Sequence, residues 1–541
     1  MTTPADLVGA FLDLRNAPFT APGSRLLVMA GEDGWLRVVT AEYERSVDEC
    51  VRLARLGVVR SDGGLVPVTS VLPHRIEFGS AARLCFVGLD ALSLWGDEPG
   101  VEVAYQVPGG ELERFPLTHG CRLAWPRGSL APSVETSISV DHEEQEVAAE
   151  REWARWFDAC PRVRDDLAPM TAYCWWALGA NIVHLGPTGD ARVVVPSKLG
   201  YVGLWQWDAY FIAVGLRHGD VALAREQLSL ALEFAGADGQ LPDVVHDGGV
   251  LASSDDLPPG DVAHLQARGS VAAGVRVPLT KPPLAAWAVR LVDEAGHDEA
   301  WLAEVLPAVL ASQEWWFRAG EDALPVYDHP YSSGLDDSPV FDGSLPVTTP
   351  DLATYLIVQD ETLAALLGDG EAAERCRARA DRTFQRLMAL WDGDSGAFRA
   401  KANGRVVTAD TVISLLPLLS GRLPADALAG LLAALDDPAR YTGAWAVPTV
   451  SRADPAFDAE AMWRGPIWLN TNALLIEGLH ASGQASRARD LAERTLAMVQ
   501  TAGGPYEYFN ADTAAKPPRA VPMFSWTAAL FVDLAVRASQ K

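Results

Sequence analysis

Carboxylate side chains stand in or close to aromatic segments at three places in the chain, each next to a glycine or a proline. The three segments are Leu204–Tyr210 (LWQWDAY), Ser333–Pro339 (SGLDDSP) and Gly503–Asn510 (GGPYEYFN). Apolar surroundings raise the pKa of a carboxyl group and suit it to proton transfer near neutral pH. The acids of these segments are therefore candidates for acid–base chemistry: Asp208, Asp336, Asp337 and Glu507.

Each segment also has a structural explanation. Asp208 precedes an apolar stretch and can serve as a helix-start residue, which contributes about 1 kcal/mol. Adjacent acids such as Asp336 and Asp337 are typical of turns. Gly503–Asn510 fits an ordinary surface loop as well. No single segment decides between structure and chemistry.

Taken together, the segments indicate carbohydrate chemistry. Two carboxyl groups in an aromatic-lined pocket are the minimal machinery for glycosidic bond hydrolysis, one protonating the leaving oxygen and the other acting on water or on the sugar carbon. The segment Trp463–Asn470 (WRGPIWLN) adds indole rings that can stack on a sugar, and Arg and amide groups that can bind hydroxyls. The chain contains 18 tryptophans, and such stacking is a common functional use of indole rings.

Composition limits the other classes of function. With 541 residues, of which 49% are hydrophobic and 21% charged, the chain can bury a large core, and its length favours two domains or one large domain with an accessory one. The 44 Lys and Arg residues against 71 Asp and Glu residues give a net charge of −27, which disfavours nucleic acid and anionic membrane surfaces as partners. No run of 18 apolar residues occurs, and Met1–Phe11 lacks a signal-peptide pattern. We expect a soluble, cytoplasmic protein.

Cofactor and metal signatures are missing from the sequence. The six cysteines are scattered without a CxxC pair, so we expect reduced core residues and neither a zinc site nor a redox dithiol. No glycine-rich nucleotide loop is present. The acidic stretch Asp141–Glu146 is interpreted as a helix start, where the helix dipole stabilises acids, in preference to a calcium site. We therefore expect no cofactor and no metal.

Two parts differ in their periodicity. Residues from about 24 to 140 contain short apolar segments separated by Gly, Pro, Asp and Ser, a spacing that predicts an antiparallel sandwich. The predicted strands are Arg25–Ala30, Trp35–Thr40, Gly64–Thr69, Arg83–Val87, Val101–Val107 and Arg122–Trp125. From about residue 146 onward the pattern is helical. We predict an N-terminal β-sandwich accessory domain over 1–145 and a catalytic domain over 146–541.

Helices of the second part alternate between buried and one-sided. Leu469–His480 is apolar nearly all round, whereas Ala485–Gln500 has apolar residues at helical spacing on one face only. The same alternation recurs in Trp207–Leu216 with Val221–Ala235, in Leu284–Ala295 with Glu299–Phe317, and in Leu352–Leu367 with Glu371–Trp391. Inner and outer rings of about twelve helices, an (α/α)6 barrel, explain this pattern; an irregular α-solenoid is the alternative.

The motifs WQWDAYF, SGLDDSP, WRGPIWLN and PYEYFN, followed by Phe524-Ser525-Trp526, occur in an order and spacing that resemble glycoside hydrolase family 63. The resemblance covers about residues 146–541 and extends more distantly to family 37 trehalases; it includes the mannosylglycerate and glucosylglycerate hydrolases. It implies an (α/α)6 barrel and an inverting mechanism on α-glucosides or α-mannosides. No cofactor is implied.

Site residues follow from the resemblance position by position. It implies that Asp336 is the general acid and that Glu507 is the general base. It also implies a substrate-binding set around them: Trp205, Gln206, Trp207, Asp208, Tyr210, Trp463, Arg464, Trp468 and Trp526. We further expect Asp208 to face Arg464 at the closed end of the pocket, and the N-terminal sandwich to shape the entrance without supplying catalysis.

Several interpretations stay open at this point. The chain lacks a PGGRF motif before Trp207 and carries Arg464 where trehalases have an Asp, so trehalose is a weaker candidate than another α-glycoside. The alternatives are a debranching-type α-glucosidase, a carbohydrate-binding barrel without turnover, and a polysaccharide lyase or glycoside phosphorylase. The identity of the sugar and of the leaving group is open, as is the oligomeric state.

Overall fold

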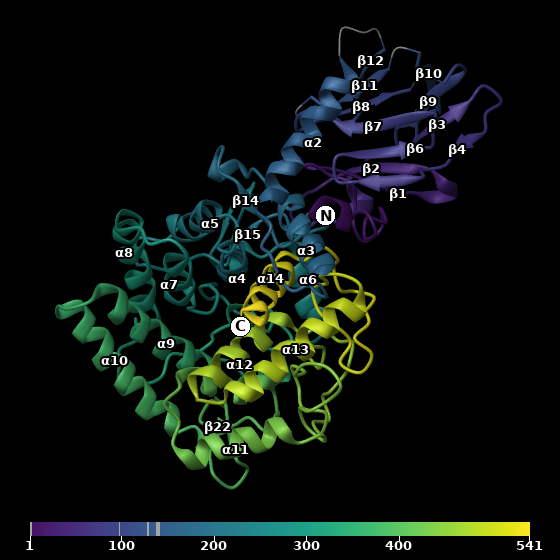
Figure 1. Ribbon diagram of the computed structural model, residues 1–541. Coiled ribbons are helices and arrows are strands. Elements are labelled where there is room, and N and C mark those ends of the chain that lie inside the picture. Colours follow the sequence, from purple (N-terminus) through teal and green to yellow (C-terminus); the bar gives the residue numbers. More distant parts are fainter. Residues whose placement is uncertain (1–2, 97, 119, 127–128, 137–140, 541) are drawn as a thin grey trace.

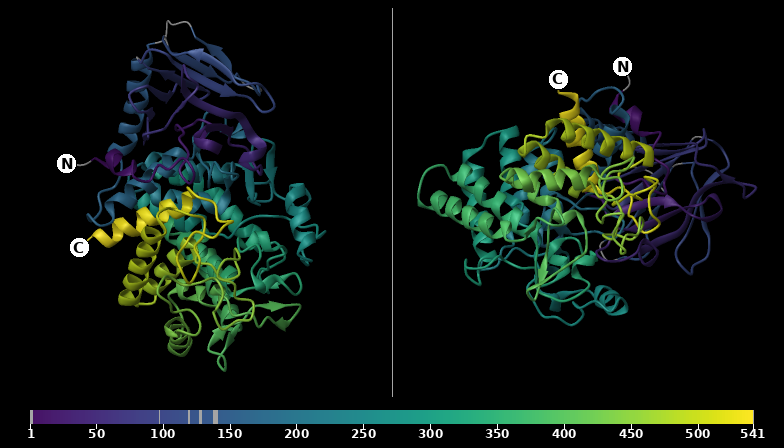
Figure 2. Two further views of the ribbon diagram at one scale, coloured as in Figure 1. Left: turned by 90° about the vertical axis from the view of Figure 1, so that its right-hand side faces the viewer. Right: turned by 90° about the horizontal axis from the view of Figure 1, so that it is seen from below.

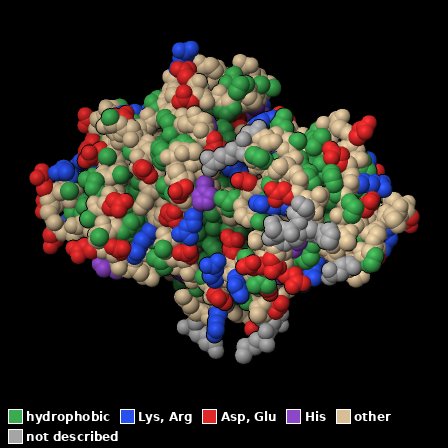
Figure 3. All heavy atoms as spheres, turned by 90° about the horizontal axis from the view of Figure 1, so that it is seen from above, with side chains coloured by type: hydrophobic (Ala, Val, Ile, Leu, Met, Phe, Trp, Pro, Cys, Tyr) green, Lys and Arg blue, Asp and Glu red, His purple; other side chains and the backbone are tan. Residues whose placement is uncertain are grey.

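The computed structural model describes residues 3–96, 98–118, 120–126, 129–136 and 141–540. The strands of the N-terminal part gather at one end of the molecule, and most of the helices lie at the other end (Figure 1). The two ends of the chain lie on the same side of the molecule in both views of Figure 2. Acidic side chains are scattered among basic and apolar ones on the face seen in Figure 3.

Two antiparallel sheets form the strand-rich part. The first has the order β1-β2-β3-β9-β10 with β4 paired to β3, and the second has the order β12-β11-β8-β7-β6-β5. The strands are β1 (Leu26–Ala30), β2 (Leu36–Thr40), β3 (Val51–Arg60), β4 (Leu65–Val66), β5 (Ser70–Leu72), β6 (Arg75–Phe78), β7 (Ala82–Phe86), β8 (Ala91–Trp95), β9 (Val101–Gln106), β10 (Glu113–Pro116), β11 (Cys121–Ala124) and β12 (Ser133–Glu135). Each of the six predicted strand segments overlaps one of these strands. The prediction of an antiparallel β fold here is confirmed.

Strand β1 joins the sandwich to the helical part, because successive side chains of a strand point to opposite faces. Leu26 and Val28 belong to the core between the two sheets. Leu27 and Met29 belong instead to the large core of the helical part. The first sheet is therefore buried on both faces near β1, and the loop that follows β2 lies against the helical part.

Helix α2 (His142–Asp158) follows the sandwich. Asp141 caps its N-terminus by accepting a hydrogen bond from the Glu144 backbone N–H at 3.0 Å. Glu146 is buried and pairs with Arg75 at 2.7 Å and Arg83 at 3.1 Å, which ties the helix to strands β6 and β7. The acidic stretch is thus a helix start, as predicted.

The helical part is an (α/α)6 barrel. Its inner ring runs through successive neighbours that contact each other and close between α14 and α4; the members are α4 (Gln206–Leu216), α7 (Ala285–Ala295), α9 (Pro350–Leu367), the 3₁₀ turns η7 (Val412–Ser414) and η8 (Leu416–Ser420), α12 (Leu469–Ala481) and α14 (Ser525–Ser539). The outer elements alternate with these along the chain; they are α3 (Ala168–Ala180), α5 (Val221–Glu233), α8 (Glu299–Trp316), α10 (Glu371–Met388), α11 (Ala425–Asp436) and α13 (Ala485–Ala502).

Two details differ from the expected ring of about twelve helices. One inner position is held by η7 and η8, since Pro417 interrupts the backbone hydrogen bonds that an α-helix needs and Gly421 ends the segment with φ 64°. Helix α3 is buried although it is an outer element, because α1 (Pro4–Val8) and α2 pack over it.

Shorter elements connect the barrel helices. They are η1 (Glu32–Gly34) and η2 (Val47–Cys50) in the sandwich, and β13 (Ile182–Val183), η3 (Gly186–Thr188), β14 (Val193–Val194), β15 (Leu204–Trp205), β16 (Val244–His246), β17 (Gly249–Leu251), η4 (Ser254–Asp256), α6 (Pro259–Ala267), η5 (Pro330–Ser333), η6 (Pro339–Phe341), β18 (Val347–Thr348), β19 (Trp391–Asp392), β20 (Ala397–Phe398), β21 (Lys401–Ala402) and β22 (Arg405–Val406) in the barrel. All six cysteines are free, as predicted. Among the described helices, none is both long and apolar enough to cross a membrane.

Candidate active site

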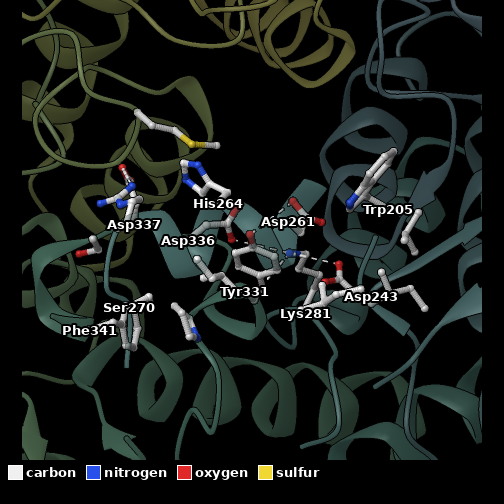
Figure 4. A pocket seen from close by; sticks show the side chains of 18 of the residues that line it. Trp205, Asp243, Asp261, His264, Ser270, Lys281, Tyr331, Asp336, Asp337 and Phe341 are labelled. Carbon is white, nitrogen blue, oxygen red and sulfur yellow. Dashed lines mark hydrogen bonds and ion pairs between the residues drawn. The ribbon is translucent and has the colours of Figure 1, made fainter. Parts of the chain in front are cut away.

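A cavity of about 510 Å³ opens beside the SGLDDSP segment. Its walls come mainly from the loop after β2, the paired strands β15, β16 and β17, helix α6, residues 330–342 and residues 462–464, and Tyr201 and Lys281 complete them. In Figure 4, Asp336 and Tyr331 lie at the centre of this cavity, with Lys281 and Asp243 on one side and Asp337 on the other. The volume falls within the roughly 300–1,000 Å³ typical of small-molecule sites.

A tight turn presents Asp336 to the cavity. The turn η5 ends at Gly334, which has φ 70° in the left-handed region. A Cβ atom on Gly334 would lie 2.2 Å from the Trp207 ring. Both the backbone angle and this close approach require glycine. Trp207 is therefore the wall behind the turn, and the glycine lets the acid loop lie directly on it.

The carboxyl group of Asp336 has few hydrogen-bonding or charged partners. About 28% of the side chain is exposed, yet Oδ1 is buried without a hydrogen bond. Lys281 Nζ is its charged neighbour, at 4.0 Å from Oδ1. Loss of water contact raises the pKa of Asp336 to about 8, an effect that the Lys281 charge only partly offsets. At neutral pH the group is mainly protonated and can donate a proton.

Lys281 is the cation among the acids of the cavity. Its Nζ lies 3.1 Å from Asp243 Oδ1 and donates a hydrogen bond to the Tyr331 carbonyl at 2.7 Å. Burial opposes the charge, but Asp243 and Asp336 together keep the pKa of Lys281 above its ordinary value. Burial also raises the pKa of Asp243 to about 6, again against the Lys281 charge. Lys281 therefore stays charged and holds the acids in place.

Glu507 lies in the loop after α13. Only 3% of its surface is exposed. The Tyr201 hydroxyl donates a hydrogen bond to its Oε1 at 3.1 Å, and the Val521 backbone N–H donates one to its Oε2 at 3.1 Å. Burial raises the pKa of Glu507 to about 7, while these two bonds lower it. The carboxyl group therefore ionises close to neutral pH.

Tyr201 connects Glu507 with the cavity. Its side chain is part of the cavity wall, and its hydroxyl is bonded to Glu507. Burial raises the pKa of Tyr201, and the charges of Glu507, Glu44 and Asp336 raise it further. Both predicted catalytic acids thus act electrostatically on one tyrosine. The structure brings them to the same region although 171 residues separate them in the sequence.

The four predicted tryptophans next to these acids form one cluster beneath the cavity. Trp463 and Trp468 stack with ring centroids 3.6 Å apart, and the Trp526 ring meets Trp207, Trp463 and Trp468 edge-on. All four are buried, and none is among the residues that line the cavity. In this structure they support the acid loops. Direct stacking on a sugar remains a prediction for them.

Asp208 and Arg464 do not face each other, so that expectation is wrong. Arg464 is bound by Asp342 through two hydrogen bonds of 3.0 and 2.7 Å and donates to the Asp337 carbonyl at 2.9 Å. These bonds turn its guanidinium toward the acid loop and the cavity wall. Asp208 lies buried in the first turn of α4, where loss of water contact raises its pKa and Lys281 is the nearby cation.

The remaining predicted residues separate into two groups. Trp205 lines the cavity together with Asp336 and Arg464. Gln206 and Tyr210 line a separate, much smaller hollow. The Gln206 side-chain oxygen accepts a hydrogen bond from the Lys281 backbone N–H at 3.2 Å, so Gln206 acts on the cavity only by positioning Lys281.

The sequence analysis missed several residues of the cavity wall; they are Tyr43, Glu44, Tyr201, Asp243, Asp261, Lys281 and Tyr331. None of them lies in one of the four motifs. Tyr43 and Glu44 come from the sandwich, in a segment where charged residues are typical of an exposed turn. A buried lysine such as Lys281 leaves no local signal, because only the fold brings it to the acids.

No cluster of three or more His, Cys, Asp or Glu side chains that could hold a metal ion occurs in the part of the chain that the structure describes.

Comparison with known proteins identifies the family. Residues 201–527, more than half of the chain, match the model of the mannosylglycerate hydrolase MGH1-like glycoside hydrolase domain. The mannosylglycerate hydrolase of Thermus thermophilus is 27% identical over 62% of this chain and 95% of its own length. The glucosylglycerate hydrolase of Mycolicibacterium hassiacum is 25% identical over 66% of this chain and 97% of its own length.

Solved structures agree with this assignment. A family 63 mannosylglycerate hydrolase of Thermus thermophilus, solved in complex with Tris and D-glycerate, has a TM-score of 0.54 at 25% identity, covering 66% of this chain and 98% of that one. A bacterial glucoamylase complexed with acarbose has a TM-score of 0.57 at 11% identity, covering 97% and 94%; this likeness concerns the fold alone, and it includes the N-terminal sandwich. With its motifs, its barrel and its family match in agreement, the chain belongs to the MGH1-like glycoside hydrolases of family 63 and is a glycoside hydrolase.

Proposed function

We propose that the protein hydrolyses an α-glycosidic bond with inversion, using Asp336 as the general acid and Glu507 as the general base. The observation that carries this proposal is geometric: Asp336 lines the cavity with a partner-poor carboxyl group, and Glu507 is hydrogen-bonded to Tyr201 on the wall of the same cavity. Burial raises the pKa of both groups, to about 8 for Asp336 and about 7 for Glu507. Between these values Asp336 holds a proton while Glu507 has lost one. That combination is what an acid–base pair needs.

The reaction then proceeds in one step. Asp336 gives its proton to the glycosidic oxygen as the bond from that oxygen to the anomeric carbon breaks. A water molecule attacks the anomeric carbon from the opposite side and gives a proton to Glu507. The carboxyl groups of such a pair are expected roughly 6.5–9.5 Å apart, which leaves room for the water. Glu507 then returns its proton to solvent and Asp336 regains one.

The sugar bound at the cleaved end is an α-glucosyl or α-mannosyl unit. The names of the relatives, mannosylglycerate hydrolase and glucosylglycerate hydrolase, support this choice. Lys281 lines the cavity and Asp208 is a buried acid within reach of the Lys281 charge, and we assign these two polar groups to the hydroxyls of the sugar. Trp205 supplies an aromatic surface on the cavity wall.

The proposal also assigns separate roles to the two parts of the chain. Residues 146–541 supply both catalytic acids, and residues 1–145 form an accessory domain that shapes the mouth of the cavity. The positions of Tyr43 and Glu44 on the cavity wall support this role. A binding protein without turnover would need neither a protonated Asp336 nor an ionisable Glu507, so this alternative has less support.

A substrate screen with product analysis tests the proposal. The purified protein is incubated with α-linked glucosides and mannosides, from glycerate conjugates to disaccharides, and the anomeric proton of the first-formed sugar is followed by NMR. We expect the β-anomer to appear first. An α-anomer as first product contradicts inversion. No turnover on any of these glycosides contradicts the hydrolase assignment of this site.

A further inference from the structure

The cavity beside Asp336 is rich in carboxyl groups, two of which, Asp336 and Glu44, are mainly protonated at neutral pH. Six carboxyl side chains line it: Glu44, Asp243, Asp261, Asp336, Asp337 and Asp342. The Lys and Arg side chains of its wall are half as many: Arg268, Lys281 and Arg464. His264 lies on the same wall. Carboxyl groups therefore outnumber the permanent cations two to one.

Each of these cations already has a carboxylate partner. Arg268 binds Asp337 at 2.7 Å, and Arg464 binds Asp342 through both of its terminal nitrogens. Lys281 is engaged by the acids on its own side, as described above. Among the described lining residues, no Lys or Arg is left over for an anionic ligand.

Glu44 reaches this wall from the N-terminal sandwich. Its backbone has φ 50° and its N–H donates a hydrogen bond to the Gly200 carbonyl at 3.1 Å. The preceding Tyr43 stacks on His246 with ring centroids 4.0 Å apart and an interplanar angle of 2°. Both contacts fasten the loop to the barrel. The Glu44 side chain remains exposed to the water of the cavity.

The rest of the wall suits a hydroxyl-rich molecule. Aromatic side chains other than Trp205 contribute to it, among them Tyr43, Tyr331 and Phe341, and such rings can pack against the apolar faces of sugars. Carboxyl oxygens accept hydrogen bonds from hydroxyl groups. A carboxylate on the ligand, by contrast, would meet like charges without a free cation to pair with.

We propose that this cavity receives the leaving group of the reaction, that it selects an uncharged, hydroxyl-rich leaving group over an anionic one, and that Glu44 is a specificity-determining residue for this choice. The inference rests on the proposed hydrolase function. It separates this chain from relatives whose names specify glycerate, an anionic leaving group. It also gives the sandwich a part in substrate choice.

The charge of Glu44 depends on pH. The charges of Asp261 on helix α6, of Asp243 directly before strand β16 and of Glu507 in the loop after α13 act on it, and Tyr201 lies near it as well. Although its surface is open to the cavity, Glu44 is enclosed by protein on several sides, and this partial loss of bulk water, followed by the charges of these three acids, raises its pKa to about 8. Glu44 therefore becomes negative as the pH rises through about 8, and discrimination against an anion grows with it.

Matched substrates measure this selection directly. The first pair is the glycosyl glycerol and the glycosyl glycerate, which differ only in a hydroxymethyl against a carboxylate group. The second pair is an α-linked glucose disaccharide and its counterpart with glucuronate as leaving group. The ratio of kcat/KM values within a pair is taken from pH 6 to 9. Titration of the catalytic acids cancels in this ratio, because both substrates meet the same enzyme.

We expect the uncharged member to be preferred by roughly tenfold or more, and the ratio to rise with pH. Glu44→Gln keeps the shape but removes the charge, so the ratio becomes smaller and rises less with pH; Asp243 ionises near pH 6 in both forms of the enzyme. Glu42→Gln is the matched control, because Glu42 pairs with Arg52 away from the cavity; it keeps the wild-type ratio.

The outcomes separate the two proposals. Equal or better turnover of the anionic members overturns the selection while leaving the hydrolase function standing. A wild-type ratio in Glu44→Gln overturns the role of this residue. Failure to hydrolyse all four substrates counts against the proposed function itself.

Discussion

A change at Tyr201 tests which group controls the low-pH limb of the pH profile of kcat/KM. Its hydroxyl donates one of the two hydrogen bonds that Glu507 receives, while Val521 donates the other. A bond of this kind stabilises the ionised carboxylate and lowers its pKa. The change Tyr201→Phe removes the hydroxyl and keeps the ring, so the pKa of Glu507 must rise.

The magnitude follows from the contact. A hydrogen bond to a charged group is worth about 1.5–3 kcal/mol, and about 1.4 kcal/mol corresponds to one pKa unit. The hydroxyl also interacts with the protonated form of Glu507, so the difference between the two forms lies at the lower end. We expect a rise of about one unit, from about 7 toward 8.

The assay is the pH dependence of kcat/KM, which reports the ionisations of the free enzyme. In the wild type it should rise with an apparent pKa near 7 and fall with one near 8, as Glu507 ionises and Asp336 loses its proton. In Tyr201→Phe the low-pH limb moves up by about one unit. The best attainable kcat/KM then falls roughly twofold, since the fraction of enzyme in the active protonation state drops from about three fifths to about one third.

A matched variant separates this effect from a general disturbance of the cavity. Tyr331→Phe removes another hydroxyl of the wall, one that bonds Asp261 and not Glu507. It should leave the low-pH limb in place. The reasoning is refuted if Tyr201→Phe leaves that limb unmoved, or if Tyr331→Phe moves it equally.

Three further predictions concern the acids, the central cation and the barrel. Asp336→Asn and Glu507→Gln should each lower kcat by roughly 10²–10⁴-fold without changing the circular dichroism spectrum or the Tm. Lys281→Met removes the charge that lowers the pKa of Asp336, so the high-pH limb of kcat/KM should move to higher pH. Asp360→Asn leaves the buried Arg379, bound at 2.6 and 2.9 Å, without its charged partner, and should lower the free energy of unfolding in urea by about 3–5 kcal/mol.

Each of these three predictions has a control variant or a result that would contradict it. Near-normal turnover in either acid variant would show that another group carries the chemistry. A high-pH limb that stays in place in Lys281→Met would mean that this limb does not report Asp336. For the barrel, Glu371→Gln breaks an exposed ion pair with Arg375 on the same helix. It should lower the free energy of unfolding by less than about 1 kcal/mol. An equal decrease in Glu371→Gln and Asp360→Asn would show that burial does not strengthen the Asp360–Arg379 pair.

The parts of the site that could be predicted from the sequence are those with a local signature. Asp336 stands in a short Gly-containing motif and Glu507 in one with Gly and aromatic neighbours, and the structure brings the two acids to one region. The Gly334 turn explains why the first motif can be recognised: only glycine tolerates both the backbone angle and the Trp207 ring. The strand periodicity likewise predicted the N-terminal sandwich, and the alternation of buried and one-sided helices predicted the barrel.

Groups that act across long sequence distances could not be predicted in this way. Lys281 reaches Asp336 and Asp243 only because the loop before α7 passes beneath the acid loop. The expected pairing of Asp208 with Arg464 was wrong for the same reason. Each residue lies in one of the recognised motifs, but the Arg464 guanidinium binds Asp342 instead. The inner ring shows a related limit, since Pro417 makes a 3₁₀ turn where apolar composition alone suggests a helix.

The N-terminal sandwich shows how a segment without catalytic motifs can still take part in the site. Its first sheet shares Leu27 and Met29 with the barrel core, so the position of the following loop is set by packing and not by that loop's own sequence. Once the sheet is seated, Tyr43 lies on His246 and Glu44 faces the cavity. If the proposals above hold, a change in this loop alters which leaving group enters while Asp336 and Glu507 stay in place. The sandwich would then let substrate choice vary independently of the chemistry.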